Sequence, residues 1–359
     1  MSLDRRHVLL GSTGLVGSLA APTLLRAQGA SINLYSARHY FSTDEVLYAE
    51  FTRQTGIAIN RVVWDGNTLI QRLRADGANS PADVLLTVDA VGLELSKQAG
   101  LLQKTSSQLL DTRVPGHLRD PDGFWYGFSM RGRVIMYDRT RIQPEQVATY
   151  EDLANPALRR QIMFAPRPTQ IPGNHTPAYA VPSYSESLVG SVLAANGPER
   201  TLEWAREVVA NLARRPRGGD RDQIYAIADG DGSIAIANTY DLGNIIRANN
   251  PRDAEVIDKI RVSFPNQNDR GAHVNICGGG VVATARNKEN AVRFLEYLAS
   301  GSAQRHFVEA NDEYPVVAGI APPASVASFG TFRADSLNAG VLARNNAETL
   351  RIMDRAGWS

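Results

Sequence analysis

The feature that most constrains the fold is a regular alternation of short apolar segments and amphipathic segments that begins at Ile32. The pattern predicts a strand at 32–35, a helix at 42–55, a strand at 57–63, a helix at 68–75 and a strand at 83–88. Ser42 and Glu45 form the S-x-x-E pattern of a capping box at the start of the first helix, and Gly56 is placed to end it. A βαβαβ series of this kind favours an α/β fold with a mostly parallel, doubly wound sheet.

A second series of strands and helices follows the first, so we expect more than one α/β unit. Its strands are predicted at 132–137, 161–165, 233–237 and 273–285, and its helices at 185–195, 199–211, 288–299 and 342–355. Asn287 is placed to cap the helix at 288–299. A length of 359 residues suits two domains. We therefore predict two lobes between which the chain crosses more than once, with residues 320–359 packed on the second lobe.

The N-terminal segment has the pattern of a bacterial export signal. Arg5 and Arg6 precede a weakly apolar run at 11–25, and Ala27 offers a small-residue cleavage site. A twin arginine before such a run is typical of the Tat route, and the run is too short and glycine-rich to span a membrane. The alternative is an accidental arginine pair in an unstructured N-terminus. We expect residues 1–27 to be a Tat-type signal peptide and the protein to function in the periplasm.

Charge and cysteine content exclude several classes of protein. The chain has 38 Lys and Arg against 37 Asp and Glu, a net charge of +1. Loss of residues 1–27 removes three arginines and one aspartate and changes this to −1. We therefore expect no nucleic-acid partner. The single cysteine, Cys277, excludes an intrachain disulfide and a cysteine-built zinc or iron–sulfur site, and is expected to be buried.

Three groups of residues, each with a tyrosine, share one position, between the end of a predicted strand and the start of a helix. They are the pair His39 and Tyr40, then Tyr184, then the pair Tyr240 and Asp241. In open α/β sheets, ligands bind outside the carboxyl ends of the strands. We therefore expect these groups to face a common cleft.

The chemistry of this set indicates a hard, highly charged cation. A phenol with a pKa near 10 is a poor ligand for most metals, but a trivalent ion displaces its proton and binds the phenolate. Helix N-termini add modest stabilisation to a phenolate charge. Ferric iron is the obvious candidate, and such a site suits binding better than catalysis. The alternative is that each tyrosine is an ordinary half-buried aromatic at a strand end, with its hydroxyl in water.

Several segments closely resemble the periplasmic ferric-iron-binding proteins of bacterial ABC uptake systems. These segments are residues 36–40 (SARHY), 51–56 (FTRQTG), 77–89 (GANSPADVLLTVD), 264–268 (FPNQN), 271–276 (GAHVNI) and 313–316 (EYPV). The resemblance covers nearly the whole chain after the signal segment, up to about residue 318. It implies a type 2 periplasmic binding protein, in which two lobes close about a hinge between two mixed sheets. We assign residues 31–128 plus 273–318 to the N-terminal lobe and 129–272 plus 319–359 to the C-terminal lobe.

The same resemblance implies the metal ligands. By this comparison His39 and Tyr40 come from the first lobe, and Tyr184, Tyr240 and Asp241 come from the second. The similar branch of the family binds iron without a synergistic anion.

Asp241 departs from the family pattern, because it stands where the family has the second of two adjacent tyrosines. A carboxylate keeps the charge and the hard oxygen donor, but it is roughly 4 Å shorter than a phenol, about one Cα–Cα step. Asp241 therefore either binds the metal directly or acts through water or as a hydrogen-bond acceptor. His175 and Tyr179, in the proline-rich segment 166–182, are alternative donors.

The function that the resemblance implies is capture of ferric iron, with ferrous iron as a variant, and delivery to an ABC permease and ATPase. The protein would be a monomer, would not span the membrane and would not be an enzyme. One alternative is a relative with an altered ligand, such as ferrous iron, another metal, an oxyanion or an organic solute. A further alternative is a secreted α/β enzyme that uses Tyr and His as general acid and base.

Overall fold

The computed structural model describes residues 30–38, 41–167 and 184–358. The predictions for the signal peptide 1–27 and for His39, Tyr40, His175 and Tyr179 therefore lie outside the described residues. No helix within the described ranges is long and apolar enough to cross a lipid bilayer.

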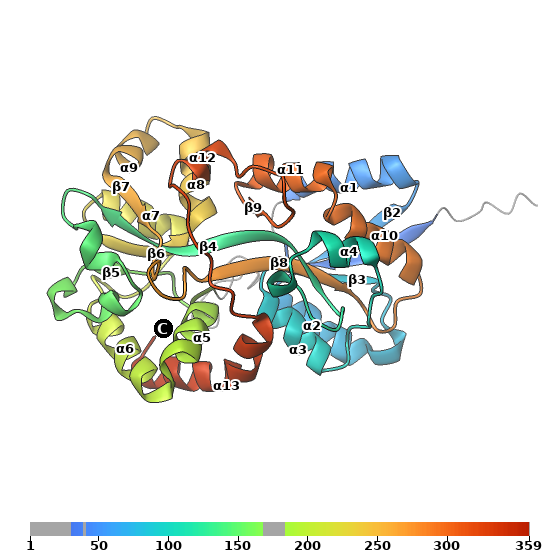
Figure 1. Cartoon of the computed structure of the whole chain (residues 1–359), viewed down its shortest axis with the longest axis horizontal. Helices are drawn as coiled ribbons and strands as arrows, with labels where there is room; N and C mark the ends of the chain where they lie inside the picture. The colour runs from blue at the N-terminus through green and yellow to red at the C-terminus, as the bar shows by residue number, and fades with distance from the viewer. Residues whose placement is uncertain (1–29, 39–40, 168–183, 359) are drawn as a thin grey trace, which may run out of the picture.

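Two α/β lobes lie side by side, and strands β4 and β8 run through the middle of the molecule between them (Figure 1). The strands are β1 (Ser31–Ser36), β2 (Ala58–Val63), β3 (Val84–Thr87), β4 (Tyr126–Asp138), β5 (Ile162–Met163), β6 (Ile234–Asn238), β7 (Ile260–Ser263), β8 (Val274–Val281) and β9 (Tyr314–Pro315). The helices of the first lobe are α1 (Phe41–Thr55), α2 (Gly66–Asp76), α3 (Ala90–Gln98), α4 (Gln108–Arg113), α10 (Lys288–Leu298) and α11 (Gly301–Asn311). The other helices are α5 (Tyr184–Asn196), α6 (Pro198–Ala210), α7 (Asp220–Ala228), α8 (Thr239–Ala248), α9 (Asp253–Lys259), α12 (Ala324–Ala327) and α13 (Ala339–Ala356).

The sheet is mixed, which confirms the fold that the family resemblance implied, whereas the mostly parallel sheet that the βαβαβ pattern alone favoured was wrong. Its order is β2-β1-β3-β8-β4-β6-β5, with β7 and β9 also paired to β4. Among these described strands three pairings are parallel and five are antiparallel. The parallel pairings are at the two ends of the sheet, whereas β8 is antiparallel to both β3 and β4, and β4 is antiparallel to both β8 and β6.

Strand β4 connects the lobes because it is 13 residues long and changes partners along its length. Its first half pairs with β8, up to Gly132 opposite Val274, and its second half pairs with β6 from Arg133 onward. The sequence pattern predicted only residues 132–137 as a strand. Gly127 and Arg131 interrupt the apolar pattern of the first half, which explains why that half was missed.

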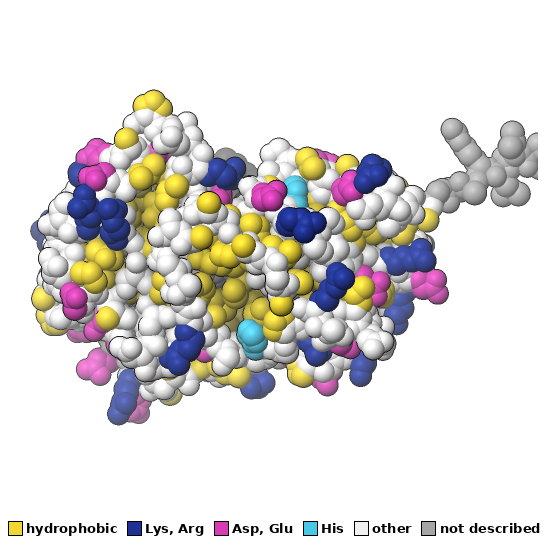
Figure 2. All heavy atoms as spheres, turned by 45° about the horizontal axis from the view of Figure 1, so that its top comes forward, with side chains coloured by type: hydrophobic (Ala, Val, Ile, Leu, Met, Phe, Trp, Pro, Cys, Tyr) yellow, Lys and Arg dark blue, Asp and Glu magenta, His cyan; other side chains and the backbone are white. Residues whose placement is uncertain are grey.

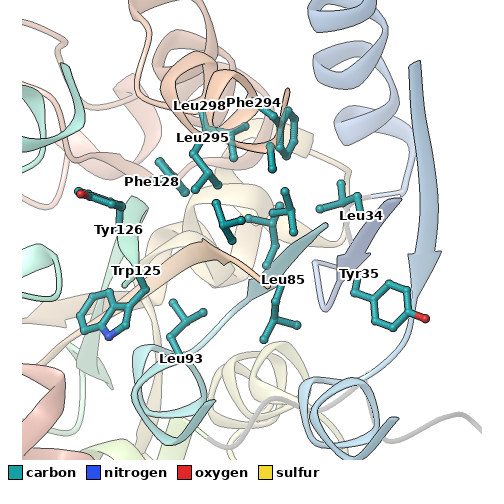
Figure 3. Close-up of a cluster of buried hydrophobic side chains, with 14 of the residues drawn as sticks. Leu34, Tyr35, Leu85, Leu93, Trp125, Tyr126, Phe128, Phe294, Leu295 and Leu298 are labelled. Carbon is teal, nitrogen blue, oxygen red and sulfur yellow. The ribbon is translucent and has the colours of Figure 1, made fainter. Parts of the chain in front are cut away.

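The hydrophobic core of the first lobe forms around strands β1 and β3. Leu34, Leu85, Phe128, Phe294 and Leu298 belong to this cluster. In Figure 3, Leu34 lies on the face of the sheet that Phe294 and Leu298 cover, whereas Leu85 points to the opposite face, toward Leu93 of α3. Burial of side chains of this size contributes about 1.5–3 kcal/mol each. This lobe therefore has a core of its own.

In the second lobe, β4 separates two apolar clusters. Ile135 packs in the cluster that contains Trp204, and Val134 and Met136 pack in the cluster that contains Ile224. Successive side chains of a strand point to opposite faces of the sheet, so helices cover both faces. Helices α5 and α6 lie on one side and α7, α8 and α9 on the other (Figure 1), which is the doubly wound arrangement.

Two of the predicted caps were wrong. Helix α1 already begins at Phe41, so Ser42 lies inside the helix instead of capping it. Asn287 occupies the N-cap position of α10, but its side-chain Nδ2 donates to Oδ2 of Asp83 at 3.2 Å and caps nothing. The predicted end of α1 is confirmed, since Gly56 follows its last residue with φ +71°.

The C-terminal helix α13 contacts both lobes. Ala339, at its start, packs in the first-lobe cluster, whereas Ile352 and Met353 pack in the second lobe. Trp358 follows the helix and stacks on Phe164 of the second lobe, with ring centroids 4.5 Å apart. Phe329, before this helix, packs in the second-lobe cluster that contains Ile224. The described part of segment 320–358 therefore packs on the second lobe near both of its ends, and the start of α13 also reaches the first lobe. The lobe boundaries given above stay a prediction.

Candidate metal site

Two of the predicted ligands lie at the N-termini of two helices of the second lobe. Tyr184 is the first residue of α5, and Tyr240 is the second residue of α8, which begins directly after strand β6. The prediction had placed Tyr240 and Asp241 before the helix, but they form its first turn. Both phenols therefore lie near the positive end of a helix dipole, which favours a phenolate.

The structure brings Tyr184 and Tyr240 together. Their side chains are hydrogen-bonded to one another, and both residues are buried, with exposed fractions of 4% and 6%. The two tyrosines are far apart in the sequence, so their contact depends on the fold. The two phenols are thus neighbours in the fold, and their role as metal ligands stays a prediction. Residues 39 and 40 lie outside the described residues.

Two buried arginines lie against the ring of Tyr184. The guanidinium carbon of Arg131 is 5.1 Å from the ring centroid and that of Arg133 is 5.7 Å away. Both residues are on β4, two positions apart, so both side chains project from the same face of the strand. Neither arginine was predicted as a site residue from the sequence. Their spacing could have indicated them: two arginines at positions i and i+2 of an apolar strand lie on one face, and buried charges require partners of opposite charge.

Carboxylates neutralise both arginines. Nη1 of Arg131 donates to Oε1 of Glu313 at 3.1 Å, and its Nη2 donates to the Val88 carbonyl. Arg133 pairs with Asp220, with 3.3 Å between Nη2 and Oδ1. The positive charge of each guanidinium is thus balanced by a carboxylate of the protein. The arginines beside the phenol of Tyr184 therefore add little net charge there.

Burial controls the ionisation of the phenols. Desolvation raises the pKa of Tyr184 to about 12, although Arg131 and the hydrogen bond from Tyr240 oppose this shift. At neutral pH the Tyr184 phenol therefore stays protonated unless a cation replaces the proton. A ligand cation must have enough charge density to displace it.

Asp241 already has partners in the protein. Its Oδ2 accepts a hydrogen bond from the backbone N–H of Asn238 at 3.2 Å, which caps α8, and its Oδ1 lies 3.7 Å from Nε of Arg221. Burial, with the neighbouring Asp220 charge, raises its pKa to about 7. The carboxylate is close enough to raise the pKa of Tyr184 as well.

Cys277 is buried, as predicted. Its Sγ accepts a hydrogen bond from Nη1 of Arg38 at 3.0 Å, and burial raises the pKa of its thiol. Within the described ranges there is no cluster of three or more His, Cys, Asp or Glu that could hold a metal.

The fold is that of a type 2 periplasmic binding protein. Its two α/β lobes are joined by the long strands β4 and β8, and polar side chains lie at helix N-termini. Residues 79–329 match the family model described as "Bacterial extracellular solute-binding protein", and the chain belongs to this family. Its members are solute-binding proteins, which is a transport class rather than an enzyme class, and they act outside the cytoplasm.

Several relatives carry names that concern iron. "Iron uptake protein A1" of Synechocystis is 43% identical over 327 residues, which cover 91% of this chain and 87% of the relative. The structure of the Trichodesmium protein FutA "in complex with iron and citrate ligands" is 45% identical, with a TM-score of 0.83, and the match covers 92% of this chain and 100% of that one. The ferric binding protein of Campylobacter jejuni is 35% identical, with the same TM-score of 0.83, over 91% of this chain and 100% of that one. These matches confirm the family that the sequence motifs predicted.

Proposed function

We propose that this chain is a periplasmic solute-binding protein that captures ferric iron and delivers it to the permease and ATPase of an ABC transporter. The family assignment supports a solute-binding role, and the names of the relatives support iron as the solute. The observation that carries the proposal is the buried, hydrogen-bonded pair of Tyr184 and Tyr240 at two helix N-termini.

The proposed ligands of the metal are the phenolates of Tyr40, Tyr184 and Tyr240 and the imidazole of His39. Ferric iron would replace the phenol protons, and three phenolates balance its three charges. The first lobe would supply residues 39 and 40 and the second lobe the other two. Closure of the lobes then follows from differential affinity, because only the closed form offers the full donor set to the ion.

Asp241 completes the proposed site in one of two ways. It either binds the metal directly, which requires it to leave the backbone N–H of Asn238 or to share its oxygens, or it acts as a hydrogen-bond acceptor beside the ligands. In the second case His175 or Tyr179 is the candidate for a replacement donor. Asp241→Ala and Tyr179→Phe, compared by iron stoichiometry and affinity, separate these arrangements.

Export, assembly and release complete the proposal. The twin arginine at positions 5 and 6 supports export by the Tat route, and the protein would act as a monomer. Protonation of the phenolates, or reduction to ferrous iron, would weaken binding by hard oxygen donors and release the cargo at the permease.

The first test is the colour of the purified protein. Ferric iron bound to phenolate gives a visible charge-transfer band, so the wild type loaded with ferric iron should be coloured and should contain one iron per chain. Titrations with and without citrate decide whether an anion takes part, because the Trichodesmium relative was solved with both iron and citrate.

Matched variants assign the band to the site. Tyr184→Phe and Tyr240→Phe should each weaken or shift it. Tyr225→Phe is the control, since its hydroxyl bonds Asp253 at 2.7 Å elsewhere in the second lobe. A colourless, iron-free wild type would contradict the proposal, and binding of an oxyanion or organic solute in its place would support the altered-ligand alternative.

A further inference from the structure

The helix that carries Tyr184 is bonded to the first lobe one turn beyond that residue. Ser187 of α5 donates its hydroxyl to Oδ2 of Asp89 at 2.5 Å. The same oxygen accepts Nδ2 of Asn275, on strand β8, at 2.8 Å, and Oδ1 caps α3 by accepting the N–H of Val91 at 2.6 Å. One carboxylate thus joins a first-lobe helix, a connecting strand and the helix of a proposed ligand.

The helix that carries Tyr240 is bonded to the first lobe in the same manner. Asn244, one turn beyond Tyr240 on α8, donates Nδ2 to Oδ2 of Asp312 at 2.6 Å. Nε of Arg247, on the next turn, donates to the same oxygen at 2.7 Å. Asp312 directly follows α11 of the first lobe and is fully buried.

The two contacts lie on opposite sides of the connecting strands. In Figure 1, α8 and α11 lie above β4 and β8, whereas α5 and α3 lie below them. A hydrogen bond to an ionised carboxylate is roughly twice as strong as a neutral one. A rotation of one lobe relative to the other must stretch such bonds, so their geometry and the orientation of the two phenols are linked.

We propose that Asp89 and Asp312 are positioning residues that hold the two tyrosine-bearing helices, α5 and α8, against the first lobe so that both phenols reach one ion. This inference rests on the proposed function for the identity of the ion. The juxtaposition itself comes from contacts within the protein: each carboxylate bonds its helix one turn beyond the tyrosine. The first lobe thereby orients donors that belong to the second.

The decisive variant is Ser187→Ala, which removes the bond to Asp89 but leaves the cap of α3 and the bond from Asn275. We expect a loss of about tenfold in ferric iron affinity, measured by competition with a chelator, and a shifted charge-transfer band. Ser187→Thr keeps the hydroxyl and should restore both. Asn244→Ala should also cost about tenfold, and the double variant about a hundredfold, since the two sites are separate.

The matched control is Ser191→Ala, one turn further along α5. Ser191 is equally buried, and its hydroxyl lies 3.4 Å from an oxygen of Asp335 rather than against the first lobe. It should lower the urea midpoint of the apoprotein about as much as Ser187→Ala does and leave iron affinity unchanged. Wild-type affinity in Ser187→Ala, or an equal loss in Ser191→Ala, would overturn the inference while the proposed function stands.

Hydrogen exchange in the apoprotein tests the inference independently of iron. Ser187→Ala should speed amide exchange in the first two turns of α5 about tenfold, and Ser191→Ala should not. If the wild type binds no ferric iron, the proposed function fails and this comparison still decides the positioning role. Unchanged exchange in Ser187→Ala would refute it.

Discussion

Replacing Glu313 by Gln should lower the free energy of unfolding by about 3 kcal/mol, because it leaves buried arginine charge uncompensated. Glu313 is fully buried, and its two oxygens lie 3.1 Å from Nη1 of Arg131 and 3.4 Å from Nη2 of Arg38. At an effective dielectric constant of about 20, each contact contributes about 5 kcal/mol before the cost of desolvation. Removing one partner of such a buried pair costs about 3–5 kcal/mol. Gln keeps the shape and some hydrogen bonding, which favours the lower end.

The assay is urea unfolding of the apoprotein, followed by the fluorescence of the buried residues Trp125, Trp204 and Trp358. The control is Glu50→Gln on the surface of α1. Oε1 of Glu50 lies only 2.6 Å from Nη2 of Arg53, but the pair is exposed to solvent, so this change should leave the urea midpoint almost unchanged. The two ion pairs have similar distances and differ in burial. If Glu313→Gln lowers the free energy of unfolding by less than about 1 kcal/mol, burial does not set the strength of the pair and the reasoning is refuted.

Three further changes test other parts of the structure. His273 is buried, and its desolvation together with Arg133 and Arg270 lowers its pKa to about 3. Because the unfolded state takes up a proton near pH 6.5 and the folded state does not, the neutral imidazole contributes fully to stability above that pH and progressively less below it. Between pH 7 and pH 5 the free energy of unfolding of the wild type should therefore fall by about 2 kcal/mol more than that of His273→Gln. Trp358→Ala should cost about 3–5 kcal/mol in urea unfolding if the C-terminus is part of the second-lobe core, and a loss below about 1 kcal/mol would contradict that packing. Gly278→Ala should cost about 1–3 kcal/mol, because its Cβ would lie 2.5 Å from the Tyr126 carbonyl across β8 and β4, and an unchanged melting temperature would show that these strands can separate.

Local sequence patterns predicted most helices and strands but not the way in which the strands pair. The helix at 342–355 and the strand at 32–35 were recognised from periodicity, and they correspond to α13 and β1 within a few residues. The antiparallel return of β8 between β3 and β4 depends on contacts between residues far apart in the chain, such as Leu85 opposite Gly280. No window of a few residues contains that information.

The candidate site was predictable to the extent that strand ends mark it. Tyr184 and Tyr240 were selected because each lies where a helix begins, and the structure joins them. The arginines of β4 were missed, because a charge in a buried strand is explained only by its partners. Those partners, Glu313 and Asp220, lie 182 and 87 residues away from Arg131 and Arg133.

Asp241 shows the limit of comparison by residue type. Its carboxylate was assigned from the tyrosine that stands there in the resembling family. In this chain it accepts the N–H of Asn238 and faces Arg221, contacts that a tyrosine could not reproduce. Its role toward a metal is therefore a question for the variants described above.

In the proposed iron-loaded form, tyrosine oxygens from both lobes hold the ferric ion. The most direct test is a crystal structure of the iron-loaded protein with the metal located by its anomalous scattering. We predict one iron atom bonded to the phenolate oxygens of residues 40, 184 and 240 between closed lobes. Iron bound elsewhere on the chain, or phenol oxygens of Tyr184 and Tyr240 that do not share a metal atom, would contradict the account.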